Sequence, residues 1–227
     1  MKLEKTEIWI ATENALPFTD GRTIRGFLGN MYKSRSEFHG HKGDDLIYRH
    51  PLIQYKNLAG LALIVGLKEG AYLLKALPKL PHLDLHYQKY KILTQEMKNN
   101  VIPFGLTSDT IRYCFKTPWI GLNEKNYQSY VALRQKKAAI DPLLEMILIG
   151  NLLSMSKSIG YVVDEKIWVK LELEQTETIE VKHDVKLISF QGGFTTNFLI
   201  PDLWGIGKFS SRGYGTVVSK MNGEGHE

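Results

Sequence analysis

The order of strand-like and helix-like segments in the first hundred residues constrains the fold of this chain most. The order is strand, helix, strand, strand, helix, strand, over residues 8–10, 23–32, 46–56, 61–66, 68–77 and 82–91. A strand–helix–strand unit that occurs twice in this arrangement is typical of a ferredoxin-like domain, in which helices pack on an antiparallel sheet. We therefore expect the first half of the chain to form such a domain.

Hydrophobic periodicity identifies these elements. Apolar residues recur at helical spacing in the first helix, and Pro78 ends the second. A short turn joins the two middle strands, so we expect them to pair as a hairpin. In the last segment apolar and polar side chains alternate, and one face is formed by Leu83, Leu85 and Tyr87.

The second half repeats the same kinds of element. Further strands are expected at residues 110–116, 166–175, 185–190 and 194–200, with a helical region from about residue 124. Asp141 and Pro142 have the residue types of an N-cap and a first helical position, ahead of a helix that is apolar on most sides and should be buried. The predicted fold class is α+β, two tandem ferredoxin-like (RRM-like) βαββαβ domains. The polar residues before Pro103 place the domain boundary between residues 1–98 and 99–227.

Composition excludes several classes of protein. The lone Cys114 cannot form an internal disulfide and excludes a multi-cysteine zinc site, which fits a reducing, cytoplasmic environment. The first residues contain no apolar signal-peptide region. The most apolar stretch, residues 143–155, is short of a membrane span, so we expect no membrane partner. The net charge of +5 is compatible with a polyanionic partner.

Two Gly-x-Gly pairs near the end of the chain enclose a basic, hydroxyl-rich segment. The residues that could bind phosphate there are Gly205, Gly207, Lys208, Ser210, Ser211, Arg212, Gly213 and Gly215. Glycines adopt positive φ readily, and successive N–H groups in that geometry form a concave anion site. The segment is neither a dinucleotide fingerprint, which needs glycine where Ser210 stands, nor a P-loop, which needs Ser or Thr after Lys208. The alternative is a flexible glycine-rich hairpin.

A second chemical signal is the pair His39 and His41 in a polar segment. The pair has three interpretations: solvated loop histidines, two ligands of a metal ion with Asp44 or Asp45 as the third, or groups for acid–base catalysis near neutral pH. Tyr48 follows, and its hydroxyl could orient a proton or hold a phosphate oxygen, whereas the alternative is an aromatic residue on a sheet face.

Four segments resemble one family. Residues 25–29 (Arg-Gly-Phe-Leu-Gly), 38–41 (Phe-His-Gly-His) and 48–56 (Tyr-Arg-His-Pro-Leu-Ile-Gln-Tyr-Lys) are similar to the first half of CRISPR-associated repeat-RNA endoribonucleases. Residues 205–215 resemble the glycine-rich loop of their superfamily. The resemblance spans nearly the whole chain. It implies two ferredoxin-like domains and cleavage of CRISPR repeat RNA without a metal ion or cofactor, by attack of the ribose 2′-OH on its own phosphate.

The resemblance also implies roles and partners. His39 and His41 would act as acid and base in an undecided order, Tyr48 would orient them, and Lys208 and Arg212 would hold RNA phosphates. CRISPR repeat RNA is the expected partner. Other CRISPR-associated effector subunits are further candidates, and edge strands permit a homodimer. The rival functions are a non-catalytic RNA-binding subunit of a CRISPR ribonucleoprotein complex and a metal-dependent nuclease.

Overall fold

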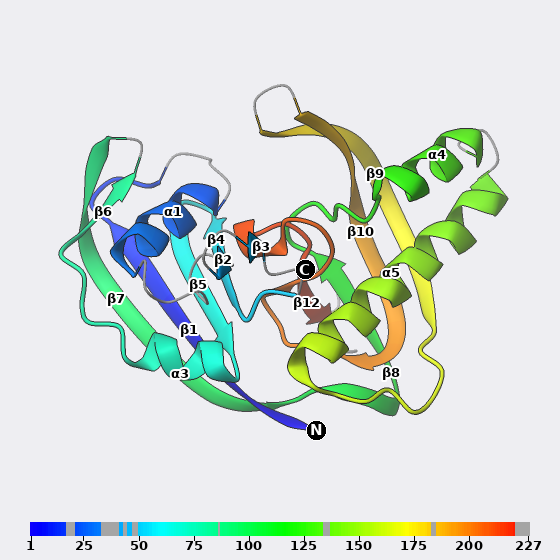
Figure 1. Cartoon of the computed structure of the whole chain (residues 1–227), viewed down its shortest axis with the longest axis horizontal. Helices are drawn as coiled ribbons and strands as arrows, with labels where there is room; N and C mark the ends of the chain where they lie inside the picture. Colours follow the sequence, from blue (N-terminus) through cyan, green and yellow to red (C-terminus); the bar gives the residue numbers. More distant parts are fainter. Residues whose placement is uncertain are drawn as a thin grey trace, which may run out of the picture. The chain divides into compact units, whose positions relative to one another are not determined.

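The computed structural model describes residues 1–16, 21–32, 41–42, 45–46, 50–85, 87–133, 137–182 and 185–220. The chain divides into two compact units (Figure 1). The N-terminal unit comprises Met1–Pro103 together with Ser210–Gly213, and the C-terminal unit comprises Phe104–Phe209 and Tyr214–Glu227. Four residues of the glycine-rich loop therefore belong to the unit formed by the first half of the chain.

The N-terminal unit contains a five-stranded antiparallel sheet in the order β4-β5-β1-β7-β6. Its strands are β1 (Lys2–Thr12), β4 (Ile53–Leu58), β5 (Leu61–Leu67), β6 (His82–Leu85) and β7 (Gln88–Pro103). Its helices are α1 (Arg22–Met31) and α3 (Glu69–Lys75), and β2 (His41–Lys42) and β3 (Asp45–Leu46) form a separate small ladder. Without β6 the order is that of a ferredoxin-like domain, so the predicted topology is confirmed and one edge strand is added.

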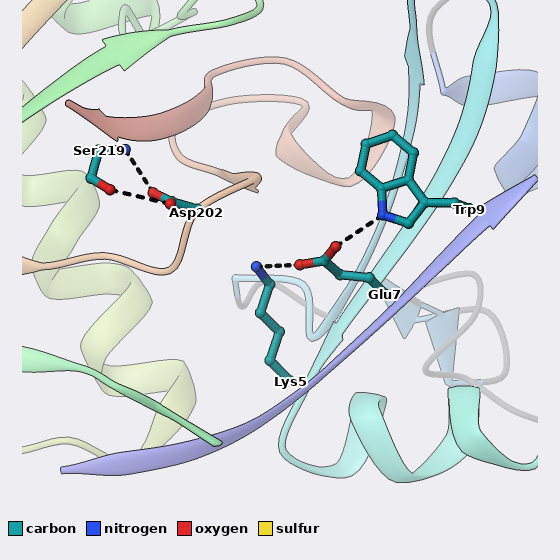
Figure 2. A network of polar contacts seen from close by, with 5 residues as sticks. All are labelled: Lys5, Glu7, Trp9, Asp202 and Ser219. Carbon is teal, nitrogen blue, oxygen red and sulfur yellow. Dashed lines mark hydrogen bonds and ion pairs between the residues drawn. The ribbon is translucent and has the colours of Figure 1, made fainter. Parts of the chain in front are cut away.

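The two faces of this sheet differ in polarity. One face packs against α1 and α3 through a buried apolar cluster that includes Ile8, Ile64 and Leu74. The opposite face of β1 carries Lys5, Glu7 and Trp9. Figure 2 shows that the Glu7 carboxylate pairs with the Lys5 ammonium at 2.7 Å and accepts a hydrogen bond from Trp9 Nε1 at 2.9 Å. The buried Lys5 is thus compensated by an ion pair on its own strand.

The segment predicted as one strand over residues 82–91 is a hairpin. Tyr87 has a φ of 65° and is fully exposed between β6 and β7, because the chain turns there instead of continuing the alternation. The last strand of the domain is β7, which pairs with β1 as far as Pro103. The predicted boundary between residues 98 and 99 therefore falls inside β7, whose residues there are polar because they are exposed rather than because they form a linker.

The C-terminal unit has a sheet in the order β11-β12-β8-β10-β9. The strands are β8 (Gly105–Phe115), β9 (Val169–Lys182), β10 (Val185–Leu199), β11 (Trp204–Gly205) and β12 (Thr216–Lys220), and the helices are α4 (Glu124–Leu133) and α5 (Lys137–Ile159). The order β12-β8-β10-β9 is again ferredoxin-like. The position of the second helix of that fold is taken by β11 and the glycine-rich loop.

Helix α5 differs from the prediction in two ways. It starts at Lys137, so Pro142 lies inside the helix instead of at its first position. The residues before Pro142 favour helix, which explains the earlier start. The helix is buried along one face only: Leu148 and Leu152 are fully buried, whereas 62% of Met146 and 45% of Leu153 are exposed. By length and composition alone, Ala139–Ile159 could cross a membrane, a test that core helices of soluble proteins also pass.

Candidate functional site

The glycine-rich loop starts and ends on the C-terminal sheet. Gly205 on β11 pairs with Thr216 on β12, and the N–H of Ile206 donates to the carbonyl of Gly215. Gly207 has a φ of 86°, and a β-carbon there would lie 2.7 Å from Trp119 Nε1. The glycine at this position is therefore required both by the backbone angle and by the close indole ring.

Four of the loop N–H groups are used in hydrogen bonds to the protein backbone. The N–H groups of Ile206, Lys208, Gly213 and Gly215 donate to the carbonyls of Gly215, Ile120, Ser210 and Pro118, at 2.8–3.1 Å. A donor that is bonded to a protein carbonyl is not available to a bound phosphate. The positive φ predicted for these glycines is confirmed at Gly207, Gly213 and Gly215, where it allows close approach of neighbouring backbone and side-chain atoms. These four donors are therefore not available to a phosphate, and the anion site stays a prediction.

The central part of the loop packs on the N-terminal unit. Ser210–Arg212 form a short 3-10 helix, η1, beside β4 and the start of α1 (Figure 1). The Gly21 N–H donates to the Arg212 carbonyl at 2.7 Å. Gly213 lies against β4, where a β-carbon would be 2.9 Å from the Tyr55 carbonyl oxygen. The glycine-rich loop is thereby anchored to the first turn of α1 and to β4.

Two arginines lie together at this anchor. Arg25 Nη1 donates to Ser211 Oγ at 3.2 Å, so its guanidinium lies beside the segment that contains Arg212. Partial burial lowers the pKa of Arg25, the nearby positive charge of Arg212 lowers it further, and Tyr55 opposes the shift. Burial raises the pKa of Tyr55, which therefore stays protonated at neutral pH. The N-terminal unit thus holds two like charges close together.

A row of buried, hydrogen-bonded polar side chains extends from the residue His50 into β4. The ammonium of Lys56, which is fully buried, donates to Gln54 Oε1 at 2.8 Å, and Gln54 Nε2 lies 3.2 Å from His50 Nε2. Because the amide oxygen is occupied by Lys56, the amide N–H donates to His50 Nε2, which places the histidine proton on Nδ1. Burial and nearby Lys5 lower the pKa of Lys56 to about 7. Such a lysine can exchange a proton near neutral pH, but its Nζ faces Gln54 and not solvent.

The predicted catalytic residues lie largely outside the described part of the chain. His39 and Tyr48 are not among the described residues, and for His41 only the backbone is described, in β2 opposite Leu46 of β3. The roles of these three residues stay predictions.

The predicted RNA-binding residues fall into two groups. Lys208 is exposed, and Ser211 and Arg212 are half-buried, so the assignment of these three side chains to RNA stays a prediction. Ser210 is buried, Gly205 pairs with Thr216, and Gly207, Gly213 and Gly215 make the close approaches described above. Sequence reasoning missed Arg25 as a neighbour of the loop. Its only signal was its place in the segment of residues 25–29, which the family resemblance includes.

Comparison with known proteins identifies relatives over both units. The model of the Cas6b N-terminal domain matches residues 1–103, and that of the Cas6b C-terminal domain matches residues 105–220. A solved structure described as Cas6b is 34% identical, with a TM-score of 0.89 over 97% of this chain and 100% of the other. A second, described as the CRISPR RNA processing endoribonuclease Cas6b, is 32% identical with a TM-score of 0.75 over the same shares. An uncharacterised protein of Methanocaldococcus jannaschii is 42% identical over 139 residues, which are 60% of this chain and 90% of that protein.

Proposed function

This chain belongs to the Cas6b family of CRISPR RNA-processing endoribonucleases, and we propose that it cleaves CRISPR repeat RNA within a precursor transcript, without a metal ion, to release guide RNAs. The observation that carries the proposal is the match of both family domains, which together cover nearly the whole chain.

The proposed reaction is an internal transesterification. A general base removes the proton of a ribose 2′-OH, and the 2′-oxygen attacks the adjacent phosphorus. The bond between phosphorus and the 5′-oxygen of the next nucleotide breaks, and a general acid protonates that oxygen. The products are a 2′,3′-cyclic phosphate and a 5′-OH. Each proton transfer by a positioned side chain contributes ~10²–10⁴-fold to the rate.

His39 and His41 are assigned to the proton transfers. Imidazole groups titrate near neutral pH, so one can accept a proton while another donates. Side chains at positions i and i+2 of an extended segment share one face, and His41 lies in the short strand β2. The spacing of the two histidines in the sequence supports their assignment to one scissile phosphate. Tyr48 is assigned to their orientation through its hydroxyl.

Cationic side chains of the glycine-rich loop are assigned to phosphate binding. Lys208 is exposed, and its backbone is fixed by the hydrogen bond to Ile120. The Arg212 carbonyl accepts a hydrogen bond from the Gly21 N–H, and a guanidinium is a strong donor to phosphate oxygens. Cations on a rigid backbone hold RNA at lower entropic cost than cations on a mobile tail.

A deoxyribose substitution tests this mechanism. The substrate is a cognate repeat RNA in which the nucleotide on the 5′ side of the cut lacks its 2′-OH. We expect the substituted RNA to bind but not to be cleaved, while the unmodified RNA gives a 2′,3′-cyclic phosphate end. Cleavage of the substituted RNA would contradict the mechanism, as would a 5′-phosphate on the product. Binding of both RNAs without any cleavage would instead indicate the non-catalytic RNA-binding subunit.

A further inference from the structure

The sheet of the C-terminal unit has one covered face. Helix α5 crosses this face (Figure 1), and the N–H of Leu171 on β9 donates to Glu145 Oε1 on the helix at 3.1 Å. Leu171 pairs with Phe194 on β10, which pairs with Tyr113 on β8, and the rings of Phe194 and Tyr113 stack. Because side chains alternate between the two faces of a sheet, the neighbours of these residues along each strand lie on the opposite face.

A row of cations crosses that opposite face. Lys170 on β9 pairs with Thr195 on β10, and Thr195 pairs on its other side with Arg112 on β8. Arg112 in turn pairs with Lys220 on β12, and all three cations are exposed. Adjacent strands lie about 4.8 Å apart, so the row is about 14 Å long. The Arg112 guanidinium also forms an ion pair with Glu172, which leaves a net positive charge on the row.

An exposed indole ring lies beside this row. Trp168 is two residues before Lys170, and buried and exposed residues alternate from 167 to 170, so both side chains belong to the same face. The backbone N–H of Trp168 donates to Asn197 Oδ1 at 3.0 Å, and its carbonyl accepts a hydrogen bond from Thr196 Oγ1 at 2.7 Å. The backbone is therefore fixed on both sides, while 38% of Trp168 is exposed. A ring on a fixed backbone can bind a ligand at low entropic cost.

We propose that Trp168, Lys170, Arg112 and Lys220 form a second RNA-binding site, which takes single-stranded RNA regardless of its sequence. A base of any type can stack on an indole ring, and cations along the same groove hold the phosphates of the strand. Neither kind of contact reads the edge of a base, so the site does not select a sequence. That the ligand is RNA rests on the proposed function. The site itself rests on the exposed ring and the cation row.

Tryptophan fluorescence tests the site with an RNA that is unrelated to CRISPR repeats. Of the four tryptophans, Trp119 and Trp204 are fully buried, so a base that stacks on Trp168 should quench the most accessible ring. We expect an oligouridylate of about eight nucleotides to quench the fluorescence of the wild-type chain in a saturable manner. Trp168→Phe should lose most of this quenching. A Trp168→Phe variant that keeps the full quenching would overturn the proposal.

Anisotropy of a labelled oligouridylate measures the affinity of the same site. Trp168→Ala should raise the Kd about tenfold or more, because a stacking partner of the base is lost. Lys170→Gln together with Lys220→Gln should reduce the slope of log affinity against log salt by ~1.4, which is ~0.7 for each lost phosphate contact. Lys157→Gln is the matched control, because Lys157 is an exposed cation on α5, and it should bind as the wild type does. An unchanged Kd in Trp168→Ala, or an unchanged slope in the double variant, would contradict the proposal.

The result with oligouridylate is independent of cleavage. A chain that binds oligouridylate through Trp168 but cleaves no repeat RNA would support this site and contradict the proposed function. A chain that cleaves repeat RNA but does not bind oligouridylate would support the proposed function and contradict this site. Displacement of the oligouridylate by polyglutamate at equal charge concentration would show a surface for acidic protein segments and would also contradict the proposal.

Discussion

The cations around the glycine-rich loop lie in three different environments. Lys208 is exposed, Arg212 is half-buried beside Arg25, and Lys56 is fully buried on β4. The protonation and the exposure of these side chains therefore differ, although the residues look equivalent in the sequence. Lys208 and Arg212 are the proposed RNA contacts, whereas Lys56 is expected to affect the stability of the fold and its dependence on pH.

Removal of either histidine should slow cleavage and leave RNA binding almost unchanged. His39→Ala and His41→Ala each remove a proposed proton-transfer group, so we expect the single-turnover rate to fall by ~10²–10⁴-fold. The Kd should stay near that of the wild type, because the phosphates are held elsewhere. Tyr48→Phe should cost less, since it removes a hydroxyl but no proton acceptor. Wild-type rates in both histidine variants would contradict their assignment.

The stability of the chain should depend on the protonation of Lys56. Burial and Lys5 lower its pKa from 10.5 in water to about 7 in the folded chain. Below pH 7 the lysine is charged in both the folded and the unfolded chain. The cost of burying the charge is then at its maximum, and the free energy of unfolding is lowest. Between pH 7 and 10.5 the unfolded chain binds a proton that the folded chain has released, so stability rises with pH.

Lys56→Met should lack this rise. In denaturant titrations from pH 7.5 to 9.5, the free energy of unfolding of the wild type should rise relative to that of the variant by up to ~1.4 kcal/mol per pH unit. The difference between the two chains is the quantity to follow, because the titration of Tyr55 and of the other groups is common to both. A difference that does not change with pH would show that folding does not lower the pKa of Lys56.

Within the elements, glycine has two distinct uses in α1 and the loop. Gly21 has an ordinary φ of −64°, but a β-carbon there would overlap the Tyr55 carbonyl and approach the Arg212 carbonyl. Gly26 is exposed within α1, and a β-carbon there would contact nothing. The first glycine is thus needed for a close approach of three segments, whereas the second only weakens the helix.

Alanine at these two positions should have opposite effects. Gly21→Ala should lower the free energy of unfolding by about 1–3 kcal/mol, because the added methyl group pushes η1 and β4 away from α1. Gly26→Ala should raise it by about 0.5–1 kcal/mol through better helix propensity. Chemical denaturation of both variants and the wild type measures these changes in the free energy of unfolding. Equal stability of Gly21→Ala and the wild type would mean that η1 does not pack on α1 as described.

The loop cations should determine the salt dependence of RNA binding. Lys208→Ala with Arg212→Ala should weaken binding and reduce the slope of log affinity against log salt by ~0.7 for each phosphate contact that is lost. Cleavage at saturating RNA should survive, because the proposed acid and base are other residues. Titrations at several salt concentrations, together with single-turnover rates, measure both effects. An unchanged slope would mean that the loop serves packing only.

For the whole molecule, the order of strands and helices along the chain could be predicted where each element has its own periodicity. The bounds of a strand could not be predicted where exposure on both faces or a bulge changes that periodicity. Residues 98–100 look like a linker but pair with β1, because an exposed strand can be polar on both faces. Gly192 and Gly193 look like a break but form a bulge inside β10, where Gly192 has a φ of 123°.

The candidate site was predictable only in part. The positive φ of three loop glycines follows from their spacing, and so does the basic character of the segment. The N–H groups of Lys208 and Gly215 donate to the carbonyls of Ile120 and Pro118, which lie far earlier in the chain, so no local pattern reveals these hydrogen bonds. The contact of Arg25 with Ser211 likewise joins residues 186 positions apart.

Metal-independent cleavage of repeat RNA by this chain can be tested directly. The most direct measurement incubates the purified chain with an end-labelled cognate repeat RNA in excess EDTA and follows the products under single-turnover conditions. We expect a single cut that leaves a 2′,3′-cyclic phosphate and a 5′-OH, at the same rate with and without EDTA. Cleavage that stops in EDTA and returns with a divalent cation would contradict it.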